Sequence, residues 1–266
     1  IIFPNGPMTN NVYSITASKT GKIFVAPGGK DITNANKGLL GDVYTYEGFY
    51  WNNLEDNILR DSTKDILNIT IDPNDENHLM AASWWNGVIE IDSNKVVKIY
   101  DITNTDSLIT PYNNSYRIAA VQYDASGNLI IANSLATNNL AFLNYHGQWG
   151  AFATNSFLPN VADEIVLLTL DNVNFYKLLF TASNKILVLN NNGDMLFVDP
   201  NNGSLLSTSK INCITQDKEG EMWIGTEKGI KVIYDLSSTF SSNSTTTSNV
   251  ECNNIVYDEQ GIAQYL

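Results

Sequence analysis

The sequence predicts an all-β fold, a β-propeller of four-stranded blades, five of which are visible. Short runs of β-branched and aromatic residues recur along the 266 residues, separated by Gly, Asn and Asp, and no helical periodicity is sustained. The runs group into units that repeat roughly every 45 to 50 residues, with three or four runs in each. Such units are typical of propeller blades, because each blade buries both faces of its sheet against its neighbours.

The predicted blades follow one another along a single domain, residues 1–266. They span about residues 10–52, 65–101, 116–152, 163–200 and 209–258. In the fourth unit the runs 165–170 and 178–180 are almost continuously apolar, as expected for strands covered on both sides. The Ser/Thr/Asn tract 237–249 has little apolar content, so we expect it to be a flexible insertion in the fifth blade.

Two units carry the same turn residues between their first and second runs. These are Asp124 and Gly127 in the third unit, and Asp217 and Gly220 in the fifth. An Asp at a strand end accepts hydrogen bonds from backbone N–H groups a few residues on, and Gly supplies the positive φ of a tight reversal. The four residues are therefore predicted to be structural turn residues.

The composition excludes several classes of partner. The net charge is −13, and Arg60 and Arg117 are the only arginines, so no basic stripe is present to neutralise phosphates. Nucleic acid is therefore not a predicted partner. No apolar run reaches the ~18 residues of a membrane helix, so we expect no membrane insertion by this chain.

The sequence shows no catalytic, cofactor or metal motif. His78 and His146 have no second ligand type at metal spacing, and the acidic stretch from Asp72 places Asn77 and Ser83 where a calcium loop needs Gly and Glu. No cofactor and no enzymatic activity are predicted, although the many carboxylates leave a glycosidase-like acid pair open. Cys213 and Cys252 are too few for a disulfide framework and are expected to be free, buried thiols.

Loop length indicates the candidate binding surface. The long connections 28–41, 52–64, 101–115 and 153–163 emerge on one face of an up-and-down propeller. The candidate ligand-binding residues on this long-loop face are Trp85, Asn86, Tyr112 and Arg117. An aromatic ring beside Asn and Arg can stack on a sugar and hydrogen-bond it, whereas the alternative for a Trp is packing between blades. Packing is the expectation for Trp84 and Trp223.

The residues also resemble a known family. The segment DKEGEMWIGTEKGIKVIY (217–234) resembles the repeat of the two-component-regulator propellers, and the wider chain resembles PorZ-type propellers of the type IX secretion system. The matching pieces are 4–7 (PNGP), 82–90 (ASWWNGVIE), 124–129 with Asn133, 147–149 (GQW) and 261–266 (GIAQYL). Ile130 and Lys177-Leu178 depart from the repeat, which often has Trp at that place.

The resemblance implies a non-catalytic scaffold and an exported location, in the periplasm or at the outer membrane or cell surface. It implies other secretion-system proteins as partners, such as a sortase-like component, and recognition of an anionic lipopolysaccharide glycan. It also implies that these blades are part of a seven-bladed ring, and the alternative is a ring that closes with five blades. Two alternatives stay open: the periplasmic carbohydrate-sensing propeller of a hybrid two-component regulator, and a carbohydrate-active enzyme.

Overall fold

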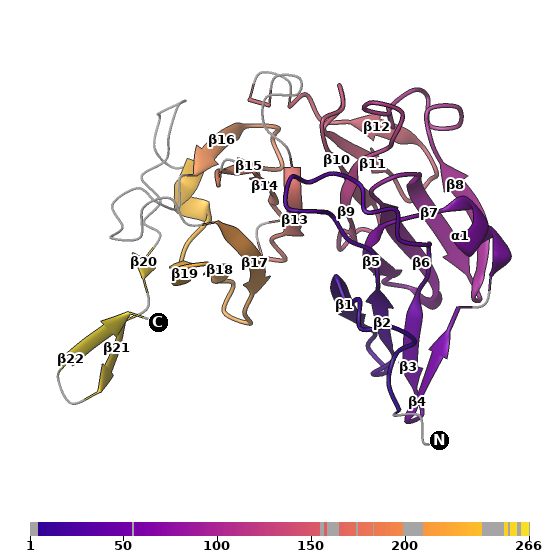
Figure 1. Cartoon of the computed structure of the whole chain (residues 1–266). Helices are drawn as coiled ribbons and strands as arrows, with labels where there is room; N and C mark the ends of the chain where they lie inside the picture. Colours follow the sequence, from indigo (N-terminus) through magenta and orange to yellow (C-terminus); the bar gives the residue numbers. More distant parts are fainter. Residues whose placement is uncertain are drawn as a thin grey trace. The chain divides into compact units, whose positions relative to one another are not determined.

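The computed structural model describes residues 5–54, 56–154, 157–158, 165–173, 175–182, 184–198, 210–240, 253–254, 256–259 and 262–265. These residues form five four-stranded antiparallel sheets, the blades of a β-propeller, together with a two-stranded hairpin (Figure 1). The chain divides into two compact units. The first, Ile1–Asn155, contains blades one to three, and the second, Ser156–Leu266, contains blades four and five.

In every blade the strands pair antiparallel in the order of the sequence. Blade one consists of β1 (Ser14–Ala17), β2 (Ile23–Ala26), β3 (Tyr44–Glu47) and β4 (Tyr50–Asn53). After helix α1 (Asn57–Ser62), blade two consists of β5 (Ile66–Asp72), β6 (Asp75–Ser83), β7 (Gly87–Asp92) and β8 (Lys95–Tyr100). Blade three consists of β9 (Ile118–Tyr123), β10 (Leu129–Asn133), β11 (Leu140–Leu143) and β12 (Trp149–Ala151).

The second unit continues the same pattern. Blade four consists of β13 (Ile165–Leu170), β14 (Lys177–Thr181), β15 (Ile186–Leu189) and β16 (Met195–Val198). Blade five consists of β17 (Ile211–Gln216), β18 (Met222–Thr226), β19 (Gly229–Ile233) and β20 (Asn253–Asn254). We expected this blade to extend to 258, but β21 (Val256–Glu259) pairs with β22 (Ile262–Tyr265) in a separate hairpin. The sequence of this hairpin repeats the Asp-x-x-Gly pattern at Asp258 and Gly261.

Apolar side chains from adjacent blades form the core of each unit. In β6, Leu79 and Ala81 belong to the cluster shared with blade one, whereas Met80 and Ala82 belong to the cluster shared with blade three. Successive residues of a strand point to opposite faces, so one strand serves both interfaces. In the second unit a cluster of described residues joins blade four, through residues such as Phe180, to blade five. Within each unit, a blade is therefore stabilised mainly by its neighbours.

The predicted turn residues cap the inner hairpins. The carboxylate of Asp124 accepts hydrogen bonds from the backbone N–H groups of Ser126 and Asn128, both at 2.9 Å, and Gly127 has φ +80°. In the equivalent turn of blade five, Gly220 has φ +94°. There the carboxylate of Asp217 also accepts a 2.7 Å bond from the indole N–H of Trp223, which ties the turn to β18.

His78 has acidic neighbours that the sequence analysis did not find. Its Nδ1 lies 3.1 Å from Asp72 Oδ2, and its Nε2 lies 2.9 Å from Glu90 Oε1. The hydroxyl of Tyr100 donates a 2.7 Å hydrogen bond to the other oxygen of Glu90. Burial lowers the pKa of His78, but the hydrogen bonds and charges of Glu90 and Asp72 outweigh this effect, so the pKa is raised above its ordinary value.

Two further expectations need correction. Cys213 is exposed rather than buried, because it follows a shift in strand register between Ile211 and Cys213 that changes which side chains face the core. Cys252 lies outside the described residues. Ser237–Phe240, the start of the expected flexible insertion, form a 3-10 helix, and the Phe240 ring lies 5.3 Å from that of Tyr176. The remainder, 241–249, lies outside the described residues.

No helix within the described residues has the length and apolar content needed to cross a membrane.

The Asp124 turn gives the first prediction. Asp124→Ala removes the carboxylate oxygen that accepts from both backbone N–H groups, and is expected to lower the free energy of unfolding by about 1–2 kcal/mol. Asp124→Asn is the matched control, since its amide oxygen can still accept from the two N–H groups, and it should retain most of the stability. Urea unfolding measures both variants. Equal losses for Ala and Asn would show that the accepted hydrogen bonds do not stabilise the turn.

The His78 network gives a pH-dependent prediction. Because the pKa of His78 is raised in the folded state, its contribution to stability is full below the unfolded pKa of about 6.5 and is lost as pH rises through the folded pKa. The destabilisation caused by His78→Gln should therefore be about 1–2 kcal/mol near pH 5.5 and smaller near pH 8.5. Urea unfolding of both proteins across this range measures the difference. A destabilisation that grows with pH would contradict the account.

Candidate functional site

The long-loop face of the first unit is formed by three connections and one turn. The connections are 27–43, 54–65 and 101–117, and the turn is 84–86 between β6 and β7. Backbone contacts hold them together. The N–H of Trp84 donates to the carbonyl of Asp65, and the N–H of Tyr116 donates to the carbonyl of Trp85, both at 2.9 Å. The turn 84–86 is thus fixed between the connectors that precede and follow blade two.

Trp84 is the centre of this face and is completely buried. Its indole N–H donates a 2.9 Å hydrogen bond to the carbonyl of Asn34, which lies 50 residues away in the sequence. The ammonium of Lys30 lies 4.3 Å from the ring centroid, and the guanidinium of Arg117 lies 5.4 Å from it. Trp84 therefore packs, as expected, and holds two cations against its ring.

Arg117 joins two of the predicted binding residues. Its guanidinium lies 5.1 Å from the ring centroid of Tyr112 as well as 5.4 Å from that of Trp84. One of its N–H groups also donates a 3.5 Å hydrogen bond to the carbonyl of Asn34. Arg117 and Tyr112 are both half-buried. Arg117 and Tyr112 are therefore neighbours on this face, and the guanidinium of Arg117 also packs near the ring of the buried Trp84.

Trp85 and Asn86 occupy the adjacent part of the face. Trp85 is half-buried, and the ammonium of Lys64 lies 4.6 Å from its ring centroid. The side-chain oxygen of Asn86 accepts a 2.8 Å hydrogen bond from the backbone N–H of Lys64. Ser83 Oγ accepts from the N–H groups of both Trp85 and Asn86. Asn86 therefore uses its oxygen to fix the loop, which leaves Trp85 as the residue of this pair better placed to contact a ligand.

Asp65 anchors the long connection between β2 and β3, and the sequence analysis missed it. It is fully buried with φ +50°, and its two carboxylate oxygens accept hydrogen bonds from the N–H groups of Gly38 and Leu39 at 2.8 and 3.0 Å. Burial raises the pKa of Asp65, and these hydrogen bonds and the charge of Lys64 act in the opposite direction. The carboxylate thus holds the loop that carries Asn34 and Lys30 against the aromatic residues.

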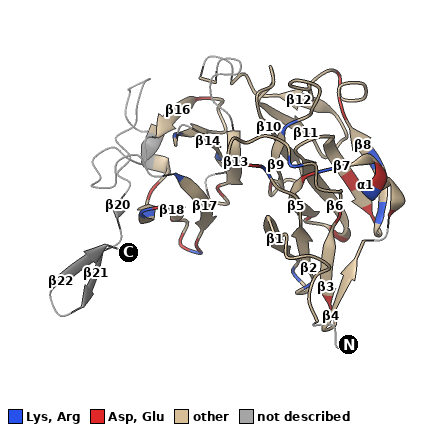
Figure 2. Ribbon diagram, viewed as in Figure 1, with Lys and Arg blue, Asp and Glu red and all other residues tan. Residues whose placement is uncertain are grey.

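Three cations lie against aromatic rings on the long-loop face, although its connections contain eight Asp and Glu residues and five Lys and Arg residues. Charged residues are sparse along the ribbon (Figure 2), and the net charge is −13 with 15 Lys and Arg. Three of these cations, Lys30, Lys64 and Arg117, lie against aromatic rings of this face. We call these cations and the rings of Trp84, Trp85 and Tyr112 the cation–aromatic cluster. Cations and ring faces together suit a ligand that combines an anionic group with a flat apolar surface.

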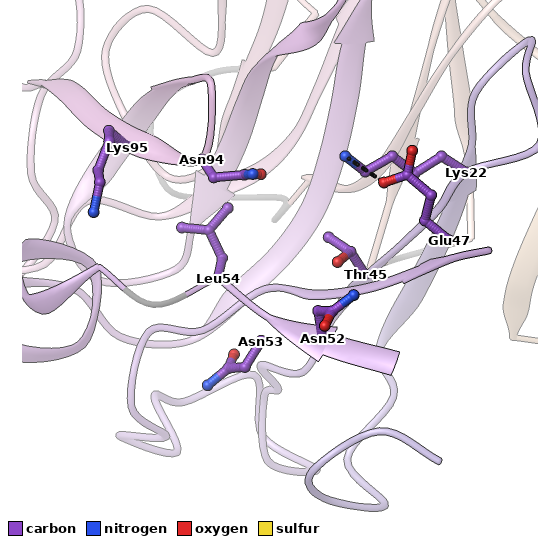
Figure 3. Close-up of a pocket in the computed structure, with 8 residues that line it drawn as sticks. All are labelled: Lys22, Thr45, Glu47, Asn52, Asn53, Leu54, Asn94 and Lys95. Carbon is purple, nitrogen blue, oxygen red and sulfur yellow. Dashed lines mark ion pairs between the residues drawn. The ribbon is translucent and has the colours of Figure 1, made fainter. Parts of the chain in front are cut away.

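A separate pocket of about 520 Å³ lies at the outer rim of blades one and two, and the sequence analysis did not predict it (Figure 3). We call it the rim pocket. Seven of its eight residues are polar. The lining consists of Lys22, Thr45, Glu47, Asn52, Asn53, Leu54, Asn94 and Lys95. The residues come from turns and strands up to 73 positions apart (22 to 95), so no local motif signals the pocket.

Within the part of the chain that the structure describes, no group of three or more His, Cys, Asp or Glu residues is arranged to hold a metal ion. The network around His78 uses both ring nitrogens for contacts with carboxylates.

Comparisons with known proteins agree with the geometry of the blades. A family profile described as "Two component regulator propeller" matches residues 205–228. Comparison with curated proteins finds no match. Among solved structures, PorZ, an essential surface component of the type-IX secretion system of Porphyromonas gingivalis, has a TM-score of 0.80 at 21% identity. The similarity covers 100% of this chain and 37% of PorZ, so the chain spans little more than a third of that protein.

Two other structures show how widely the fold is shared. The extracellular domain of BT3049 from B. thetaiotaomicron, named as a hybrid two component system, has a TM-score of 0.55 at 18% identity, covering 92% of this chain and 37% of that one. Virginiamycin B lyase of Staphylococcus aureus has a TM-score of 0.64 at 14% identity, covering 96% of this chain and 73% of the lyase. The chain is therefore a PorZ-like β-propeller in fold, and a two-component-regulator propeller repeat matches the beginning of its fifth blade.

Proposed function

We propose that this chain is a non-catalytic binding propeller of an exported bacterial surface complex related to type IX secretion, and that its long-loop face recognises an anionic glycan. The observation that carries the proposal is the cation–aromatic cluster, which gathers Lys30, Lys64 and Arg117 on the rings of Trp84, Trp85 and Tyr112. The likeness in fold to PorZ, a surface component of such a system, supports the setting.

The chemistry of the cluster fits an acidic sugar. A pyranose ring has an apolar C–H face that stacks on an aromatic side chain, and a carboxylate or phosphate on the sugar pairs with Arg or Lys. The net charge of −13 repels an anion at long range. This repulsion is screened beyond about 8–10 Å at physiological salt, so the local cations dominate once the ligand is in contact.

The proposed partners and location follow from the same comparison. PorZ is a surface component, and the regulator domains similar in fold are extracellular. These likenesses support a location of this chain in the periplasm or at the cell surface. There it would connect a glycan on lipopolysaccharide with other secretion proteins, such as a sortase-like component.

The proposal predicts a specific effect of charge at Lys64. Lys64→Gln removes the ammonium that lies over Trp85 and is expected to weaken binding to lipopolysaccharide that carries an anionic polysaccharide by about threefold to tenfold. Biolayer interferometry with immobilised lipopolysaccharide measures this change. The matched control is Lys98→Gln, since Lys98 also lies 4.5 Å from an aromatic ring, that of Tyr100, but is located on β8 away from the long loops.

The control should bind as the unchanged chain does. Equal weakening by Lys64→Gln and Lys98→Gln would attribute the effect to overall charge. Equal affinity for lipopolysaccharide with and without the anionic polysaccharide would reject glycan recognition by the long-loop face. Circular dichroism of each variant confirms that its fold is retained.

A second candidate is the sensing portion of a hybrid two-component regulator. The profile match at residues 205–228 and the likeness in fold to BT3049 favour it. The full-length gene separates the two candidates. A transmembrane helix followed by kinase motifs would select the regulator, and a short β-sandwich module after the propeller would select the scaffold.

A further inference from the structure

We infer that the rim pocket is a second ligand site, separate from the long-loop face, and that it binds a neutral sugar residue. Lys22, Glu47 and Asn94 lie at the short turns β1–β2, β3–β4 and β7–β8. In an antiparallel blade these turns lie at the strand ends opposite to the long connections, although the lining also includes Leu54, the first residue of connection 54–65. The rim pocket shares no residue with the cation–aromatic cluster. The inference does not depend on the proposed recognition of an anionic glycan.

Strand register places three of the lining side chains, together with Tyr50, on one face of blade one. Thr45 pairs with Asn52, and Glu47 pairs with Tyr50, across β3 and β4. Directly opposed residues of an antiparallel pair project to the same side, and alternate residues of a strand do so as well. Thr45, Glu47, Tyr50 and Asn52 therefore project together. Because β4 is the outermost strand of its blade, this face is reached from the rim.

The lining selects for a ligand with many hydroxyl groups. Small-molecule pockets of this size are usually mostly apolar, whereas here Leu54 is the single apolar lining residue. The side chains of Asn52 and Asn94 carry amides that both donate and accept, as is needed to bind sugar hydroxyls.

One ion pair accounts for two of the three charged residues of the rim pocket. The ammonium of Lys22 lies 3.3 Å from the carboxylate of Glu47, so the two charges largely offset each other. Lys95 is the other charged lining residue, and the chain as a whole carries −13. The rim pocket therefore lacks the grouped cations of the long-loop face.

The turn beside the pocket presents two exposed aromatic side chains. Phe49 is 80% exposed and Tyr50 is 72% exposed. Gly48 and Phe49 have φ +58° and +72°, as the two central residues of a tight hairpin turn require. Tyr50, on the same strand face as Asn52, can stack on the C–H face of a sugar held by the amides.

The test is a titration of the chain, labelled with ¹⁵N, with three uncharged disaccharides: cellobiose, lactose and N,N′-diacetylchitobiose. At least one should shift the amide resonances of Asn52, Asn94 and Tyr50 with a Kd of about 1 mM, as is usual for a small hydrated ligand. Tyr50→Ala should weaken this binding at least about fivefold through loss of stacking. Tyr145→Ala is the matched control, because Tyr145 is also exposed but lies on the β11–β12 turn of blade three.

Each outcome decides the inference. Shifts at the rim pocket that are lost with Tyr50→Ala and kept with Tyr145→Ala and Lys64→Gln support a second site distinct from the cation–aromatic cluster. An absence of shifts with all three disaccharides up to about 10 mM overturns the inference. Shifts at these residues caused only by a uronic-acid disaccharide would overturn the neutral ligand class, and binding that Lys64→Gln abolishes would place the ligand on the long-loop face.

Discussion

The structure depends on the burial of sheet faces against the adjacent blades of the same unit. Blade two shows this most clearly, since alternate residues of β6 enter the cluster with blade one and the cluster with blade three. Burial of a Val, Leu or Ile side chain contributes about 1.5–3 kcal/mol, so the many buried residues of these clusters outweigh any single polar contact. The hydrogen bonds of the turns and of the His78 network make smaller contributions to the stability of this framework, which the apolar core holds together. This framework also fixes the connectors of the long-loop face.

The same arrangement explains why binding residues gather where they do. In short turns such as that of Asp124, the polar side chain already accepts hydrogen bonds from the backbone N–H groups of the turn. The long connections have more freedom, and buried groups such as Asp65 and Trp84 fix their course. Cations that are packed on rings lose little further entropy when a ligand binds, because their side chains are already ordered. The cations of the long-loop face are therefore preorganised for binding, whereas an exposed lysine on a flexible loop would not be.

The sequence was sufficient for the fold because the signals of a blade are local. Strand period, Gly turns and Asp caps lie within a few residues of one another, as at Asp217 and Gly220. The site was only partly predictable. Loop length pointed to Tyr112 and Arg117, but the contact of Arg117 with Asn34 spans 83 residues, and no local pattern reports it. The exposure of Cys213 was missed for a related reason, since a register shift cannot be read from residue types.

The central claim is that the cation–aromatic cluster contacts an anionic glycan. Hydroxyl-radical footprinting with mass spectrometry tests it most directly, by comparing side-chain oxidation with and without lipopolysaccharide that carries an anionic polysaccharide. The account predicts reduced oxidation of Trp85 and Tyr112 in the presence of the glycan, and unchanged oxidation of the exposed Tyr145 and Phe175. Unchanged oxidation of Trp85 and Tyr112 at a glycan concentration that saturates binding would contradict the claim.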